Sequence, residues 1–139
     1  MCIRDRVTAG PTNEYIDPVR FITNKSSGKQ GYEIAKSLSK KGFDTTLISG
    51  PTNLTIDADI KLIEVETADE MLLETQKNLP ANVAVFSAAV ADFKINKKYE
   101  YKIKKQDSLN FFSALFSTLS VSAANPITRS GLIELWFET

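Results

Sequence analysis

Strand-type segments alternate with helix-type segments along this chain, and that alternation restricts the possible folds more than any other feature of the sequence. The helix-type segments begin near residues 26–28 and at residue 67, and they stop at residues 40–42 and about residue 79. The strand-type segments are residues 7–9, 43–49, 60–65 and 82–89. Strands and helices that alternate at this spacing predict a mostly parallel, doubly wound α/β sheet with helices on both faces.

The loops that leave the carboxyl ends of these strands are the expected place for a site, because ligands of open parallel sheets bind there. The tetrapeptide GPTN begins at Gly10 and again at Gly50, directly after the first two strand segments. Gly and Pro interrupt regular structure, and Thr and Asn favour turns, so the recurrence indicates two similar exits from the sheet. One recurrence without surrounding similarity does not indicate a repeat protein.

The composition excludes several classes of function. The 139 residues contain no histidine and one cysteine, Cys2, so a histidine-based triad, a Cys/His zinc site and an internal disulfide are impossible. Seventeen basic residues balance seventeen acidic ones, which removes the general positive field of a non-specific nucleic-acid binder. No apolar run approaches the roughly 20 residues of a membrane span, and no signal-peptide pattern opens the chain. We therefore expect one domain in the cytoplasm.

The two ends of the chain differ from its body. Residues 1–6 (MCIRDR) place three charges directly before the first strand segment, and they equal a translation of a transposon adapter used in sequencing libraries. We expect them to be a sequencing-adapter scar outside the fold. Residues 110–139 are poor in charge and show no clear period. They are either a genuine buried helix and strand or an out-of-frame tail.

Small residues and a lysine stand at the start of the first helix segment. Ser26, Ser27 and Gly28 leave backbone N–H groups free to face an anion, and Lys29 adds a positive charge to the helix dipole. This pattern predicts a phosphate-binding loop. The alternative is an ordinary helix start in which Ser26 or Ser27 is the N-cap.

Arg20 and Asn24 lie between the first turn and this helix segment. An arginine can hold a carboxylate or phosphate through two hydrogen bonds, and an asparagine amide can donate to an oxygen that gains charge during acyl transfer. A solvated loop is the alternative interpretation.

Residues 87–93 (SAAVADF) end the last strand segment with small side chains. A nucleotide base or ribose can lie against such a backbone, and Asp92 can accept a hydrogen bond from it. The alternative is that the small residues serve close helix–sheet packing and that Asp92 is a turn residue.

A lysine-rich segment follows, in which Tyr99, Tyr101 and Ile103 alternate with charges. This alternation predicts an extended arm with one basic face, suited to a polyphosphate or an RNA backbone, or else a plain solvated face. Its lysines are Lys94, Lys97, Lys98, Lys102, Lys104 and Lys105. Separately, Tyr32 and Lys36 have the spacing of the short-chain dehydrogenase pair, although they lie on the first helix rather than after several strands.

Taken in order, the motifs of this chain resemble the phosphopantothenoylcysteine synthetase family, the ligase half of a bacterial bifunctional flavoprotein of coenzyme A biosynthesis. The resemblance runs over residues 7–109 and implies a partial Rossmann-like nucleotide-binding synthetase domain, truncated at the C-terminus. Its motifs are TAGPTNEYIDPVRFITNKSSGKQGYEIA, TTLISGPTNL, VETADEM, SAAVADF and KIKKQD.

The resemblance implies ligation in two steps. The carboxylate of 4′-phosphopantothenate attacks the α-phosphate of CTP to give an acyl-cytidylate and pyrophosphate, and the amine of L-cysteine then displaces CMP. It also implies catalytic roles for Asn24, Arg20 and Lys102. The residues implied to bind the nucleotide are Gly10, Ser26, Ser27, Gly28, Lys29, Ala88, Ala89, Asp92, Phe93 and Lys102.

Further expectations come from the same resemblance. Mg²⁺ accompanies CTP, no metal ligand is assigned to the chain itself, and the molecule is a homodimer with exchanged arms. The flavin-dependent decarboxylase domain expected upstream is missing here, so no flavin is expected. The family's later strand motif and lysine loop have only faint echoes, at residues 125–127 and 137–139. The chain is therefore expected to be a fragment, and its activity is in question. Two other functions stay open: an NAD(P)-dependent reductase of the short-chain type, and a non-catalytic nucleotide- or RNA-binding module.

Overall fold

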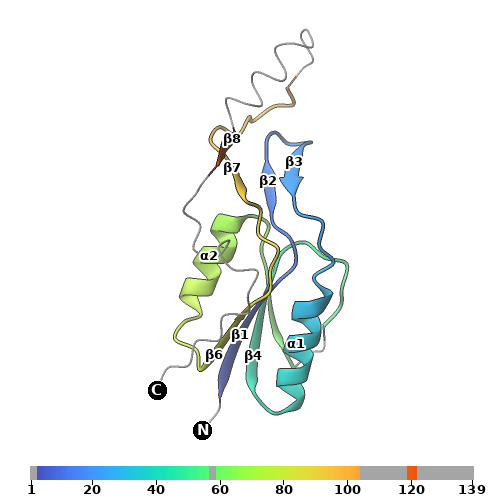
Figure 1. The fold of residues 1–139 in the computed structure, drawn as a ribbon, viewed down its shortest axis with the longest axis vertical. Coiled ribbons are helices and arrows are strands. Elements are labelled where there is room, and N and C mark those ends of the chain that lie inside the picture. Colours follow the sequence, from blue (N-terminus) through green and yellow to red (C-terminus); the bar gives the residue numbers. More distant parts are fainter. Residues whose placement is uncertain (1–2, 57–58, 104–118, 122–139) are drawn as a thin grey trace.

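A four-stranded parallel sheet forms the centre of the molecule in a computed structural model that describes residues 3–56, 59–103 and 119–121. The strand order is β5-β4-β1-β6 (Figure 1). Three of its strands follow one another along one half of the sheet: β1 (Arg4–Ala9), β4 (Asp44–Ser49) and β5 (Lys61–Glu64). β6 (Val83–Phe86) pairs with the other edge of β1. The order reverses between β1 and β6, and doubly wound sheets place their ligands at such a reversal.

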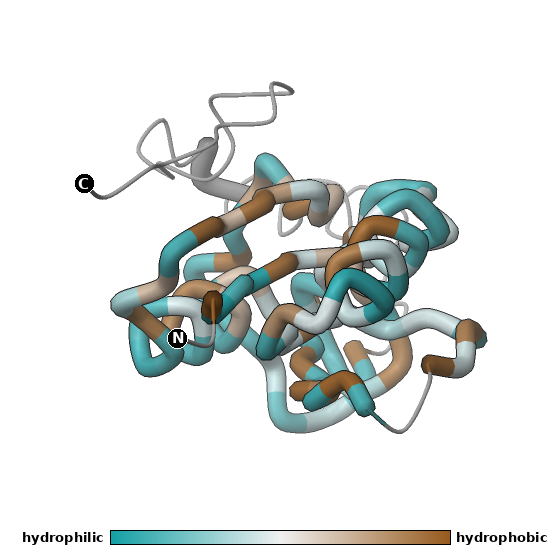
Figure 2. The backbone as a smooth tube through the Cα atoms, turned by 90° about the horizontal axis from the view of Figure 1, so that it is seen from below, coloured by the Kyte–Doolittle hydropathy of each residue, from teal (hydrophilic) through white to brown (hydrophobic). Residues whose placement is uncertain are grey.

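Among the described residues, one helix covers each face of the sheet. Helix α1 (Lys29–Lys40) packs Tyr32 and Ala35 against Val7 and Leu47. Helix α2 (Ala68–Lys77) packs against the opposite face, with Met71 at the centre of a second apolar cluster. In the view of Figure 2, hydrophobic and hydrophilic residues alternate along the backbone, as burial of one side of each element requires. The predicted α/β class with helices on both faces is confirmed.

The helix boundaries follow local signals in the sequence. Thr67 is the N-cap of α2, and it forms a reciprocal capping box with Glu70, as the sequence predicts. The N-cap of α1 is Gly28, in a left-handed conformation with φ 72°. The alternative interpretation, with Ser26 or Ser27 as N-cap, is wrong, because Gly28 occupies that position and only glycine adopts this conformation without steric cost.

The first strand begins earlier than the sequence predicts. Residues 4–6 are part of β1 and pair in parallel with residues 44–46 of β4. The side chain of Asp5 is fully buried, and that of Arg6 is 9% exposed. The expectation that residues 1–6 lie outside the fold is therefore wrong for residues 4–6, because neighbouring strands on both sides impose extended backbone here.

Two short antiparallel pairs extend from the carboxyl end of the sheet (Figure 1). β2 (Asn13–Tyr15) pairs with β3 (Phe21–Thr23), and β7 (Phe93–Ile95) pairs with β8 (Leu119–Val121). The first pair carries the chain from the end of β1 to the start of α1. Within the predicted basic arm, β7 is the strand that the described residues form, and Lys104 and Lys105 lie outside them.

Candidate nucleotide site at the carboxyl ends of the strands

The exits of β1 and β4 pass each other in close contact. A Cβ atom on Gly50 would stand 1.6 Å from the carbonyl oxygen of Pro11. The amide of Gly50 also donates to the carbonyl of Ala9 at 2.9 Å. No side chain fits between these two backbones, so the second GPTN begins with the residue that the crossing requires.

Two more glycines, Gly10 and Gly28, lie at the place where these two loops cross. Gly10 and Gly28 have φ values of 76° and 72°, and a Cβ on Gly28 would lie 3.2 Å from the Cα of Gly10. The Cγ2 atom of Thr52 would be 2.9 Å from a Cβ on Gly10 and 2.8 Å from one on Gly28. The loop after β1, the start of α1 and the loop after β4 therefore meet through bare backbone.

The loop after β6 is bound to the same place. The amide of Ala89 donates to the carbonyl of Gly10 at 2.8 Å, and the amide of Ala91 donates to Oγ1 of the buried Thr12 at 2.9 Å. The small side chain of Ala88 precedes these bonds and is half-buried. The predicted nucleotide motif thus lies directly against the loop after β1.

The side chain of Asn24 is hydrogen-bonded to the same strand-end motif. Its Nδ2 donates to the carbonyl of Val90 at 2.9 Å, which joins positions 66 residues apart. The preceding residue, Thr23, donates through Oγ1 to the carbonyl of Thr12 at 2.8 Å. Two of the predicted groups, the asparagine and the strand-end motif, are therefore brought together.

The serines at the start of α1 point their oxygens at backbone amides. Oγ of Ser26 accepts from the amide of Gly28 at 3.3 Å, and Oγ of Ser27 accepts from the amide of Lys29 at 3.4 Å. Both are long hydrogen bonds, which an incoming anion can replace with stronger ones. Lys29 is the first residue of α1, and its side chain is exposed.

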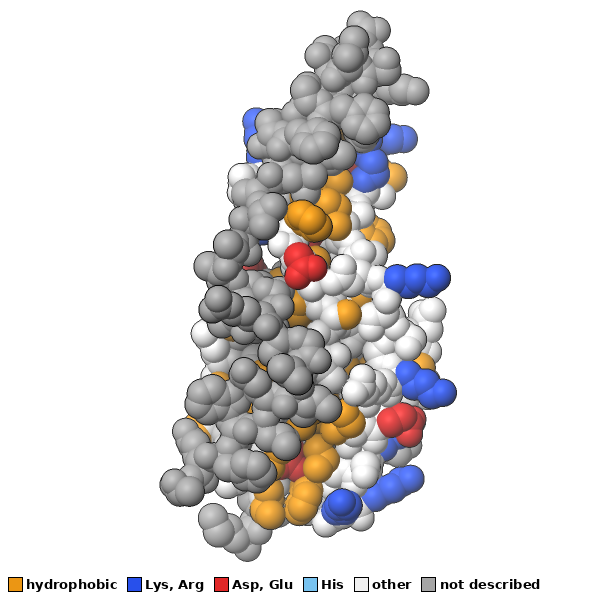
Figure 3. Space-filling model, in the orientation of Figure 1, with side chains coloured by type: hydrophobic (Ala, Val, Ile, Leu, Met, Phe, Trp, Pro, Cys, Tyr) orange, Lys and Arg blue, Asp and Glu red, His pale blue; other side chains and the backbone are white. Residues whose placement is uncertain are grey.

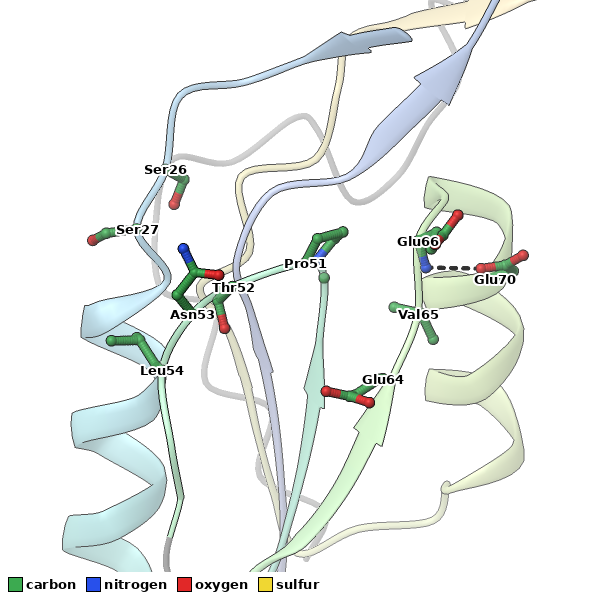
Figure 4. Close-up of a pocket in the computed structure, with 11 residues that line it drawn as sticks. Ser26, Ser27, Pro51, Thr52, Asn53, Leu54, Glu64, Val65, Glu66 and Glu70 are labelled. Carbon is green, nitrogen blue, oxygen red and sulfur yellow. Dashed lines mark hydrogen bonds between the residues drawn. The ribbon is translucent and has the colours of Figure 1, made fainter. Parts of the chain in front are cut away.

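A cleft of about 740 Å³ opens beside these serines. Figure 4 shows Ser26 and Ser27 on one side of it, and Glu64, Glu66 and Glu70 on the other. The end of β4 and the loop that follows it form the wall between the two sides. Its lining residues are Ser26, Ser27, Gly50, Pro51, Thr52, Asn53, Leu54, Glu64, Val65, Glu66 and Glu70.

On the acidic side of the cleft, backbone amides at the start of α2 already donate to carboxylates of the chain itself. Glu70 accepts from the amide of Glu66 at 2.8 Å, and Glu14 accepts from the amide of Ala68 at 2.9 Å. Burial raises the pKa of Glu14, and the hydrogen bond from Ala68 works against that rise. Because these amides bind carboxylates, we assign the anion-binding end of the cleft to α1.

The guanidinium of Arg20 is bonded to other groups of the chain. Its Nε donates to Oδ2 of Asp17 at 2.9 Å, and its Nη2 forms an ion pair with the same oxygen. Nη2 also donates to the carbonyl of Ile103 at 3.1 Å. The hydrogen bonds from Arg20 hold the pKa of the Asp17 carboxyl well below its usual range. The solvated-loop alternative for Arg20 is therefore wrong, because the guanidinium is part of a hydrogen-bonded network.

The remaining predicted residues lie on the projecting end, which is the part of the molecule beyond the carboxyl end of the sheet that carries β2, β3 and β7. Phe93 begins β7 and is 44% exposed, and the side chains of Asp92 and Lys102 are also exposed. Figure 3 shows Lys and Arg side chains along one edge of this face and towards the end that carries β2, β3 and β7. Nζ of Lys94 forms an ion pair with Oδ2 of Asp69 at 2.7 Å, so this lysine already has a carboxylate partner.

Tyr32 and Lys36, which have the spacing of the short-chain dehydrogenase pair, both bond to other side chains of the fold. The hydroxyl of Tyr32 is buried and accepts from Oγ1 of Thr52 at 2.9 Å. Nζ of Lys36 lies 3.5 Å from a carboxylate oxygen of Glu33. With its hydroxyl held inside the core, Tyr32 is not placed to exchange a proton with a substrate.

Sequence reasoning missed the residues that hold the site together. Thr12, Asp17 and Thr52 each bond or pack across long sequence distances, and the GPTN recurrence was the one signal that pointed towards two of them, Thr12 and Thr52.

Within residues 3–56, 59–103 and 119–121, no group of three or more acidic, His or Cys side chains is placed to hold a metal ion. In the same part of the chain, no helix is long and apolar enough to cross a membrane.

Comparison with known proteins identifies relatives of this arrangement. The family model of the DNA/pantothenate metabolism flavoprotein C-terminal domain matches residues 4–121. The coenzyme A biosynthesis bifunctional protein CoaBC of Haemophilus influenzae is 46% identical over 100 residues, which are 71% of this chain and 25% of that protein. CoaBC of Mycobacterium tuberculosis strain H37Rv is 48% identical over 101 residues, which are 71% of this chain and 24% of that protein. The chain thus spans about a quarter of these relatives.

Solved structures show the same fold. The crystal structure of the C-terminal domain of a CoaBC protein superposes with a TM-score of 0.66 at 39% identity, over 73% of this chain and 55% of that one. A mutant of Cab2 in complex with phosphopantothenate-cysteine gives a TM-score of 0.61 at 16% identity, over 98% of this chain and 57% of that one. At that identity the second match supports the fold alone.

Proposed function

Because this chain belongs to the family of the DNA/pantothenate metabolism flavoprotein C-terminal domain, we propose that it carries the nucleotide half of a ligase site for coenzyme A biosynthesis. The reaction joins 4′-phosphopantothenate to L-cysteine through an acyl-cytidylate made from CTP. The observation that carries the proposal is the hydrogen bond from Asn24 to Val90, because it sets an amide donor beside the strand-end motif. The same motif is bound to Gly10 and so lies next to the start of α1.

In the first step, a carboxylate oxygen of phosphopantothenate attacks the α-phosphorus of CTP, and the bond to the β-phosphate oxygen breaks to release pyrophosphate. Charge develops on phosphate oxygens during this displacement, and preorganised donors lower its barrier. The amides at the start of α1 and the charge of Lys29 supply such donors. Lys102, exposed on the segment tied to Arg20, adds a second positive charge.

In the second step, the cysteine amine attacks the acyl carbonyl, CMP leaves with the oxygen that bridged carbon and phosphorus, and the amine loses a proton. Nδ2 of Asn24 uses one N–H for Val90, and an amide nitrogen carries two. The second N–H is available to the carbonyl oxygen of the acyl-cytidylate as that oxygen gains charge. Asn24 is thereby assigned to the intermediate.

Mg²⁺ fits this site as a partner of the nucleotide. Protein side chains do not form a cage for a metal ion among the described residues. Mg²⁺ retains water and is commonly held through substrate phosphates together with one or two carboxylates. We assign its ligands chiefly to the triphosphate, which it would bring to the site partly neutralised.

A homodimer and an upstream flavin-dependent decarboxylase domain complete the proposal. The projecting end exposes large apolar side chains, as a surface that meets a second copy does. They are Val19, Phe21, Phe93 and Tyr101, which are 59%, 46%, 44% and 82% exposed. Light scattering behind size-exclusion chromatography measures the dimer directly. The relatives at 46–48% identity are named bifunctional proteins, which supports a second domain.

The decisive assay is pyrophosphate release by the protein that contains this chain. Release must require CTP and phosphopantothenate together, and CTP must outperform ATP. Asn24→Asp keeps the size of the side chain and removes the Nδ2 donor, so we expect the acyl-cytidylate to accumulate while product falls about 100-fold. Asn82→Ala, at the opposite end of β6, is the control. Product formation that Asn24→Asp leaves unchanged would refute the role of Asn24.

A further inference from the structure

The buried carboxylate of Asp17 is the centre of a hydrogen-bond network that the proposed reaction does not use directly. Oδ1 accepts from the amides of Val19 and Arg20, both at 2.9 Å. Oδ2 accepts from Nε of Arg20 at 2.9 Å and forms the ion pair with Nη2. Oδ2 also accepts from the amide of Ile103 at 3.2 Å. Asp17 is 0% exposed, so it cannot reach a substrate itself.

This network joins two segments that are far apart in the sequence. Arg20 and Ile103 are 83 residues apart, and Nη2 of Arg20 donates to the Ile103 carbonyl at 3.1 Å. Both the N–H and the C=O of Ile103 are therefore bound by the Asp17–Arg20 pair. The neighbouring residue on the chain is Lys102, whose side chain is exposed.

We propose that Asp17 is a positioning residue that fixes the backbone next to Lys102, so that the lysine meets the polyphosphate beside the loop that carries Arg20. This inference rests on the proposed function, because it assigns Lys102 to the nucleotide. The segment has another attachment at Tyr99, whose amide donates to the Ile16 carbonyl at 2.9 Å. Between the two attachments the chain is exposed, with Tyr101 at 82%. Loss of the Asp17 attachment would release the end that bears Lys102.

Charge explains why an aspartate suits this position. A carboxylate accepts from all five donors through its two oxygens, whereas an asparagine amide keeps one oxygen and turns an NH2 group, itself a donor, towards the rest. Hydrogen bonds from Arg20 lower the pKa of Asp17, so the carboxyl stays ionised at neutral pH. The variant Asp17→Asn therefore sets an N–H against the Ile103 amide or the Arg20 guanidinium while keeping the size of the side chain.

The first measurement is amide hydrogen exchange in the intact chain. In Asp17→Asn we expect the Ile103 amide to exchange at least about 10-fold faster, while the Val7 and Leu47 amides in the sheet keep their rates. Asp44→Asn removes the same charge at an exposed position at the start of β4 and serves as the control. Unchanged protection of Ile103, or equal loss of protection throughout the sheet, would overturn the positioning role.

The second measurement is a double-mutant cycle on nucleotide affinity, with Mg-CTP and CMP as probes. Lys102→Ala is expected to lower CTP affinity about 10-fold and to leave CMP affinity unchanged, since CMP lacks the outer phosphates. Asp17→Asn should lower CTP affinity about 5-fold with the same selectivity, and should change it less than 2-fold when Lys102 is already alanine.

The outcomes separate the two proposals. If the unchanged chain binds no CTP, both the proposed nucleotide site and the role of Asp17 in it are overturned. If CTP binds and Lys102→Ala weakens it, but the effects of the two substitutions simply add, the nucleotide site stands and the positioning role of Asp17 is overturned. Coupled effects together with selective exchange at Ile103 support it.

Discussion

Replacing Asp5 with valine should make this protein more stable. Asp5 lies in the central strand β1, fully buried, and neither of its carboxylate oxygens has a hydrogen-bond partner among the described residues. It shares the side of the strand with Val7, which belongs to the apolar cluster under α1. A valine here suits a strand, continues the apolar face and leaves no polar atom unpaired.

The size of the effect follows from two contributions. Leaving a polar group buried without a partner costs about 1–3 kcal/mol, and burying a valine side chain contributes about 1.5–3 kcal/mol. Some of this gain is lost to imperfect packing of the new side chain. We therefore expect Asp5→Val to raise the free energy of unfolding by about 3 kcal/mol at neutral pH.

The gain depends on pH in a definite direction. Burial raises the pKa of Asp5 above its usual 3.8, the nearby Arg6 partly opposes this, and Asp44 adds to it. A group with a raised folded pKa favours folding below its unfolded pKa, and this contribution is lost as pH rises through the folded pKa. The advantage of Asp5→Val should therefore be smallest below pH 3.8 and grow above it until the folded carboxyl is ionised.

Urea unfolding followed by circular dichroism at several pH values measures both effects. With a slope of about 1.5 kcal/mol/M, 3 kcal/mol corresponds to a midpoint shift of about 2 M. Glu33→Gln, on the exposed side of α1, is the control and should change stability by less than about 0.5 kcal/mol. A midpoint that is unchanged or lower for Asp5→Val, or an advantage that shrinks as pH rises, would refute the reasoning.

Four further substitutions test the packing, a helix cap and an ion pair. Gly50→Ala should prevent folding or cost more than about 3 kcal/mol, because its Cβ would stand 1.6 Å from the Pro11 oxygen. Gly42→Ala, with φ 84° and open space around it, should cost only about 1 kcal/mol; urea unfolding compares the two. Thr67→Ala should cost about 1 kcal/mol through loss of the α2 N-cap, measured in the same way. Asp17→Asn should flatten the acid side of the stability curve. The lowered pKa of Asp17 stabilises the fold above the unfolded value of 3.8, and this stabilisation is lost as pH falls towards the folded value, which acid titration of unfolding detects.

Local signals were sufficient to locate both helices and the four strands of the parallel sheet, but not all of their boundaries. The capping box from Thr67 to Glu70 fixed the start of α2, and apolar periodicity located both helices. The start of β1 was predicted at Val7 rather than Arg4, because Asp5 and Arg6 are charged. Pairing with strands on both sides outweighed that local preference, as tertiary contacts commonly do.

The site was predicted only where its residues are neighbours in the sequence. The start of α1 and the strand-end motif could be identified from small residues at a βα junction. The bond from Asn24 to Val90 spans 66 residues, and that from Arg20 to Ile103 spans 83, so neither leaves a local pattern. The resemblance supplied roles for Asn24 and Arg20, but their partners required the folded chain.

The two ends of the central sheet are built on opposite principles. At the carboxyl end, the buried Asp17 binds five donors, and Thr12 accepts from the backbone of the strand-end loop. At the amino end, the buried Asp5 has no such partner among the described residues. A fully satisfied polar network holds one geometry, whereas an orphaned carboxylate only lowers stability. Asp5 can therefore be exchanged for an apolar residue without loosening the site, and the same change at Asp17 would release it.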